Sequence, residues 1–163
     1  MTLLELVISI TVLSMVLVVA GGYLTNSVKA YNSSVDNVSV FNKLRFVSER
    51  IAKELRNINH NGANYVINNS SATQFDFDDK TGNQVIIDYD GVTDQLSLSY
   101  TIPVVNALLA DGITAFSFNY YTGDGISAPA TNADIVFVEY SITMQENSTS
   151  YSSKSRLTFR DGS

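Results

Sequence analysis

The chain begins with an apolar run that restricts how it can fold. From Leu6 to Leu24 the sequence contains no Asp, Glu, Lys or Arg. As an α-helix, these 19 residues would rise about 28 Å, close to the thickness of the hydrocarbon layer of a membrane. The one charged side chain before the run is Glu5. A carboxylate in an apolar environment is costly unless it is paired, so Glu5 needs a partner if this segment is buried in lipid or among other helices.

Three interpretations compete for residues 1–24. A cleaved secretory signal would carry Lys or Arg before the apolar run, and none precedes it here. A plain single-span membrane anchor explains the length of the run but gives Glu5 no role. The third interpretation rests on the motif around Glu5 itself.

The segment Met1-Thr-Leu-Leu-Glu-Leu, followed by a long apolar helix, resembles the start of mature type IV pilins and pseudopilins. The resemblance implies that a prepilin peptidase removes a basic leader and leaves Met1 as an N-methylated terminus. It also implies that the subunit waits in the bacterial inner membrane. A pilus assembly platform driven by ATP then extracts it into a helical homo-oligomer, which is an extracellular or periplasmic filament.

The physical role of Glu5 in such a filament follows from burial. Apolar helices from many subunits would form a dry core, where an unpaired carboxylate costs several kcal/mol. The resemblance supplies a partner, the amine of Met1 in a neighbouring subunit. The unpaired N–H groups of the first helical turn add favourable potential. Met1 and Glu5 are therefore the predicted assembly residues.

Gly21 and Gly22 depart from the family pattern, because many pilins carry a proline near this point. Each glycine weakens a helix by about 1 kcal/mol relative to alanine. We expect local loosening of the helix between Ser14 and Tyr23. The alternative is that the small residues allow close contact between helices.

After Thr25 the helical pattern continues on one face only. Apolar residues recur in steps of three and four at Val28, Tyr31, Val35, Val38, Phe41, Leu44, Val47, Ile51, Leu55 and Ile58. This spacing predicts one helix from about Thr2 to about Asn59. Val40 and Phe46 lie off the stripe and are expected to face neighbouring subunits. The predicted organisation is an apolar transmembrane or filament-core half (1–24), an amphipathic half (25–60) and a β-rich head (61–163).

Beyond residue 62 the pattern changes to the alternation typical of strands. Strands are expected at 64–67, 74–78, 84–89, 95–100, 113–121, 135–144 and 151–159, with hairpin turns at 79–83 and 90–94. Residues 104–110 are expected to form a short helical turn, and 122–133 an exposed loop. Sequential antiparallel pairing with one face on the helix gives an α+β, pilin-like lollipop. The segments 46–56 and 107–125 also resemble J-type minor pseudopilins.

The remaining composition argues against several functional classes. A net charge of −6 is a poor match to a phosphate backbone, so no nucleic acid partner is expected. His60 is the only histidine and the chain has no cysteine, so we predict no enzyme and no cofactor. Asp88, Asp90 and Asp94 surround a glycine and form a weak calcium candidate, for which a plain Asp-Gly hairpin turn is the favoured alternative.

These features together predict a structural subunit of a bacterial type IV pilus or pilus-like filament. One alternative is a J-type minor pseudopilin in a type II secretion or pilus-initiation complex. Another is a membrane-tethered binding module or adhesin, in which Glu5 would tolerate substitution.

Overall fold

The structure is a computed structural model that describes residues 2–61, 64–146 and 149–159. It divides into two compact units, Met1–Ser39 and Val40–Ser163. The boundary falls inside the single helix α1 (Leu3–Leu55), within the segment that the sequence assigned to the amphipathic half. The fold is α+β, as predicted.

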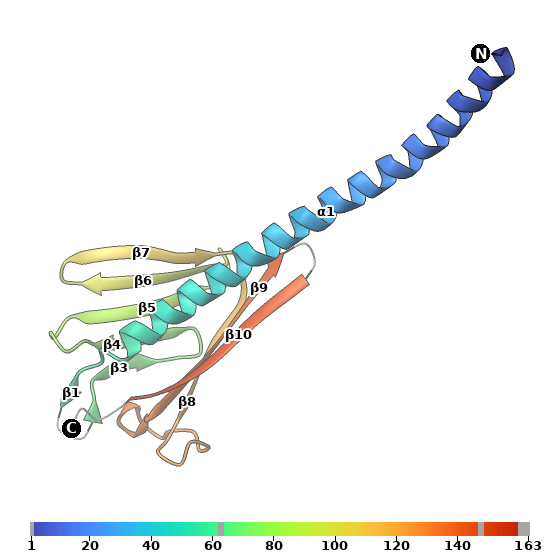
Figure 1. Cartoon of the computed structure of the whole chain (residues 1–163). Coiled ribbons are helices and arrows are strands. Elements are labelled where there is room, and N and C mark those ends of the chain that lie inside the picture. Colours follow the sequence, from blue (N-terminus) through green and yellow to red (C-terminus); the bar gives the residue numbers. More distant parts are fainter. Residues whose placement is uncertain (1, 62–63, 147–148, 160–163) are drawn as a thin grey trace. The chain divides into compact units, whose positions relative to one another are not determined.

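The first unit consists of the N-terminal part of α1. Every described residue as far as Val35 is exposed, including all the large apolar side chains of the uncharged run. The ribbon of α1 in Figure 1 is continuous, and the helix includes Gly21 and Gly22. The predicted long N-terminal helix is confirmed.

The helix ends at Leu55, a few residues before the predicted end at Asn59. Beyond Leu55 the backbone pairs with a distant segment of the chain instead of continuing the helix. The amide of Asn59 donates to the carbonyl of Asp78 (2.8 Å), and Ile58 forms an isolated β-bridge with Asp79. These contacts hold the backbone extended and outweigh the helical spacing of Ile58.

Five antiparallel strands form the larger sheet, in sequential order. They are β3 (Ile67–Ser70), β4 (Gln74–Asp78), β5 (Gln84–Asp90), β6 (Gln95–Thr101) and β7 (Val104–Asp111). The turns predicted at 79–83 and 90–94 join β4 to β5 and β5 to β6. The predicted helical turn at 104–110 is wrong, because these residues belong to β7 and all except Leu109 pair with β6.

A second sheet contains β8 (Ile113–Tyr121), β9 (Phe137–Glu146) and β10 (Thr149–Thr158), in the order β10-β9-β8. The short strands β1 (His60–Asn61) and β2 (Asn64–Tyr65) pair with each other. The loop between β8 and β9 contains the 3₁₀-helix η1 (Asn132–Asp134). All described pairings are antiparallel, and each joins strands consecutive in sequence.

The core of the second unit lies between the C-terminal part of α1 and the two sheets (Figure 1). Leu44, Val47 and Ile51 of the predicted stripe are buried there. The hydroxyl of Tyr140 on β9 donates to the carbonyl of Ser48 at 2.8 Å, which fixes the helix against the smaller sheet. Val40 is also buried, with 5% of its surface exposed, so its predicted outward position is wrong.

Candidate assembly site on the N-terminal helix

Glu5 lies in the first turn of α1, where it forms a reciprocal pair of hydrogen bonds with Thr2. The amide of Thr2 donates to the Glu5 carboxylate at 3.3 Å, and the amide of Glu5 donates to the Thr2 hydroxyl at 3.4 Å. This arrangement is a capping box, which satisfies two backbone donors at a helix N-terminus. Sequence reasoning missed it, although the Thr-x-x-Glu spacing is a readable signal.

The two capping bonds are long compared with the usual N–H···O distance of about 2.9–3.0 Å. Thr2 and Glu5 are both exposed. The carboxylate therefore keeps most of its capacity to accept hydrogen bonds from a cation outside its own chain. Its predicted partner, Met1, lies outside the described residues.

The hydroxyl groups within the apolar run donate to carbonyls of their own helix. Ser9 bonds the carbonyl of Glu5 at 2.8 Å, and Thr11 bonds that of Ile8 at 2.8 Å. Ser14 bonds the carbonyls of Ile10 and Thr11. A polar group satisfied within its own segment costs little in a medium without water. These side chains are therefore compatible with lipid or with a dry bundle of helices.

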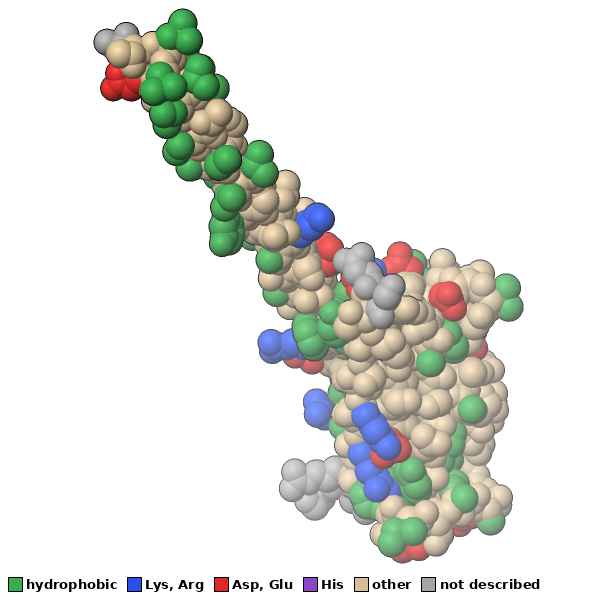
Figure 2. All heavy atoms as spheres, turned by 90° about the vertical axis from the view of Figure 1, so that its right-hand side faces the viewer, with side chains coloured by type: hydrophobic (Ala, Val, Ile, Leu, Met, Phe, Trp, Pro, Cys, Tyr) green, Lys and Arg blue, Asp and Glu red, His purple; other side chains and the backbone are tan. Residues whose placement is uncertain are grey.

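Hydrophobic side chains follow one another along the N-terminal part of α1 in Figure 2, with backbone and small polar groups exposed between them. Helix α1 contains one segment long and apolar enough to cross a membrane by length and composition. Nine of its side chains illustrate the exposure, each with at least half of its surface accessible: Leu3, Leu4, Ile8, Ile10, Val12, Leu13, Met15, Leu17 and Val18. Exposed apolar surface of this extent is typical of a segment that contacts a membrane or another protein.

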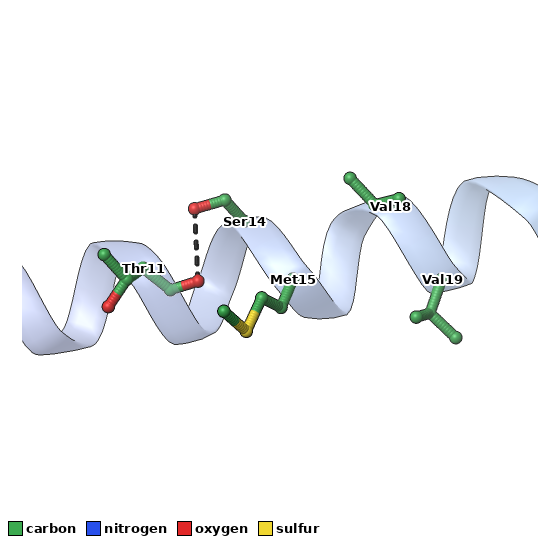
Figure 3. Close-up of a pocket in the computed structure, with 5 residues that line it drawn as sticks. All are labelled: Thr11, Ser14, Met15, Val18 and Val19. Atoms are coloured by element: carbon green, nitrogen blue, oxygen red, sulfur yellow. Dashed lines mark hydrogen bonds between the residues drawn. The ribbon is translucent and has the colours of Figure 1, made fainter.

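Two shallow, open hollows lie between side chains on the surface of the apolar run. One, of about 480 Å³, is lined by Thr11, Ser14, Met15, Val18 and Val19 (Figure 3). The first four stand at positions i, i+3, i+4 and i+7, the set that forms a hole for a knob in helix–helix packing. A second hollow, lined by Met15, Val16, Val19, Ala20 and Tyr23, contains the same set beginning at Val16.

Gly21 and Gly22 lie in regular helix. A methyl group added to either would meet nothing within 4 Å. The hydroxyl of Thr25 donates to the carbonyls of both glycines, at 3.1 and 3.0 Å. The predicted loosening therefore stays a prediction about the assembled state, and so does the alternative of a small-residue contact.

The acidic turn at 88–94 is built as a hairpin. Asp90 accepts hydrogen bonds from the amide of Val92 (2.9 Å) and the hydroxyl of Thr93 (2.8 Å), and these bonds lower the pKa of its carboxyl. Asp94 has a positive φ of 56°. Across residues 2–61, 64–146 and 149–159, no group of three His, Cys, Asp or Glu side chains is placed to hold a metal ion. Asp88, Asp90 and Asp94 are thus not gathered into a calcium site.

His60 lies in β1, where its ring packs against Tyr65 with the centroids 4.3 Å apart. Helix α1 ends at Leu55, before this strand begins. Glu5 is the charged side chain in the first turn of α1, directly before the uncharged apolar run. Neither a scan against protein-family models nor a search of curated proteins gave a match to this chain.

Proposed function

We propose that this protein is a structural subunit of a bacterial type IV pilus or pilus-like filament and assembles through the N-terminal part of α1. One observation carries the proposal. The uncharged run of a 53-residue helix is exposed to solvent, with a single carboxylate in its first turn. The buried core of the domain that follows begins at Val40 and, among the described residues, includes none from this segment.

The apolar surface accounts for why this segment is stable only away from water. Burial of one Leu, Ile, Val or Met side chain contributes about 1.5–3 kcal/mol, and the run supplies twelve such side chains. In a membrane this surface contacts lipid. In the filament it contacts copies of itself, so the chain exchanges one apolar solvent for another at little cost.

Glu5 supplies the specificity. In a bundle of helices the carboxylate is stable only beside a positive group, and the amine of a neighbour's Met1 is the proposed partner. A plain anchor in a fluid membrane would gain nothing from this charge. Glu5 thus favours the filament over the plain anchor, because only an ordered neighbour brings a cation to this depth.

Electron microscopy tests the proposal most simply. The full-length protein would be expressed in a bacterium that has a pilus assembly platform, and material sheared from the cells would be imaged and probed for this chain. Long fibres that contain the chain as their main component are expected. Protein that stays entirely in the membrane, with the platform working on another subunit as a control, would overturn the proposal.

A further inference from the structure

The apolar stripe of α1 continues past the membrane-length run into a polar segment. Its members are Leu24, Val28, Tyr31, Val35 and Val38, here called the seam, which follow each other in steps of four, three, four and three. Between 50% and 70% of each side chain's surface is exposed. The other residues between 25 and 39 are polar apart from Ala30. The seam is therefore a narrow apolar line on a helix that is otherwise suited to water.

The apolar stripe is buried in one part of the helix and exposed in another. In the second unit Leu44, Val47 and Ile51 are covered by the sheets and are at most 3% exposed. In the first unit the seam has no such cover. A line of large apolar side chains in a water-facing segment favours a partner.

The spacing indicates that the partner is another helix. Alternating steps of three and four are the heptad pattern that supports a left-handed pair of helices. Steps of seven from Tyr31 toward the N-terminus meet only large apolar residues, which are Leu24, Leu17, Ile10 and Leu3. The row through Val28 meets Gly21 and Ser14, and small residues at such positions let helices in membranes approach closely. The pattern thus runs unbroken from the apolar run into the seam.

Charge permits the partner to be a second copy. Between Leu6 and Asn42 the only charged residues are Lys29 and Asp36. They lie seven residues apart on one face of the helix, away from the seam, and have opposite signs. Two parallel copies therefore bring no net charge together along the seam, and each offers the other the same apolar line.

We propose that the seam packs in register against the seam of a second copy, and that this parallel pair forms in the membrane before the filament assembles. The inference rests on the proposed function in one respect, since insertion in a common membrane is what holds two copies parallel. The proposed pair also makes Gly21 a contact residue, because it lies seven residues before Val28 in the same row.

Single-cysteine variants test the pair, because the chain has no cysteine of its own. Val28→Cys, Tyr31→Cys and Val35→Cys would be oxidised in membranes that contain the full-length protein. Asn26→Cys and Ser33→Cys are matched controls, since both side chains are exposed and lie on the opposite face. Disulfide-linked dimers are expected at the three seam positions, at least about tenfold more than at the controls, because Cβ atoms must come within about 4.5 Å. Equal linking at all five positions, or none, would overturn the proposal.

The same variants in a Glu5→Gln background separate this inference from the proposed function. Seam dimers that persist when fibres are lost support pairing before assembly. Seam dimers that disappear together with the fibres would overturn it. Wild-type fibres without seam dimers in the membrane would refute the pair and leave the proposed function standing. Seam dimers without fibres under any condition would refute the filament and leave the pair standing.

Discussion

The two roles of Glu5, helix cap and ion-pair partner, separate cleanly in a pair of substitutions. Glu5→Gln keeps a side chain that can complete the capping box, because glutamine serves at this position as glutamate does, but it removes the charge. Thr2→Ala removes the hydroxyl that accepts the bond from the Glu5 amide and keeps the charge. The two variants are therefore matched controls for each other.

The expected magnitudes differ. Removing one partner of a buried ion pair costs about 3–5 kcal/mol, and 3 kcal/mol corresponds to about a hundredfold change in an equilibrium constant. Loss of a cap costs about 0.5–2 kcal/mol. The lower value applies here because the two bonds are 3.3 and 3.4 Å long and exposed. It corresponds to about a twofold change at the first turn of the helix.

Sheared filaments, quantified against the amount of the chain in the membrane, provide the assay. Glu5→Gln should reduce the filament fraction by about a hundredfold or more, whereas Thr2→Ala should leave it within about a factor of two to three. The reasoning is refuted if Glu5→Gln assembles normally. It is equally refuted if Thr2→Ala is as damaging as Glu5→Gln, since capping and not charge would then be the role of the residue.

Three further outcomes are expected of the full-length protein in detergent. Replacing the Gly21–Gly22 pair by alanines should raise helix stability by about 1 kcal/mol per site, because neither methyl group meets an obstacle; a lower melting temperature in far-UV circular dichroism would contradict this. Ile51→Ala, at a fully buried site, should lower the free energy of unfolding by about 2–5 kcal/mol, and Phe46→Ala, at an exposed site, by much less; equal losses in denaturant titrations would be evidence against the described core. The hydrogen bond and charge of Lys43 lower the pKa of Asp111. The stability that the ionised Asp111 carboxylate contributes is therefore present above about pH 4. It is lost as the pH falls through the lower pKa that Asp111 has in the folded state. Asp111→Asn should flatten that part of an unfolding curve measured against pH, and an unchanged curve would count against the pair.

The long helix and most strands could be read from the sequence because they depend on local periodicity. The stripe through Leu44, Val47 and Ile51 and the alternation of Gln95–Thr101 each report which face is buried. Hairpin turns at Asp79 and Asp90 follow from the hydrogen bonds that aspartate makes with the next few amides. Such features need no knowledge of what packs against them.

The errors occurred where distant residues decide the structure. Strand β7 reads Val-Val-Asn-Ala-Leu-Leu-Ala-Asp, without alternation, and its register with β6 shifts between Leu96 and Ser97. Pairing with an existing strand, not its own pattern, makes it a strand. The burial of Val40 and the division of the head into separate sheets likewise arise from contacts far apart in the chain. The capping box of Thr2 and Glu5, in contrast, was readable from four residues.

The most direct test of the assembly mechanism is a density map of the filament at a resolution that shows side chains. The mechanism predicts the carboxylate of Glu5 within about 4 Å of the terminal amine of Met1 in a neighbouring subunit. A filament in which Glu5 bonds only to Thr2 of its own chain, with no cation from another subunit nearby, would contradict it.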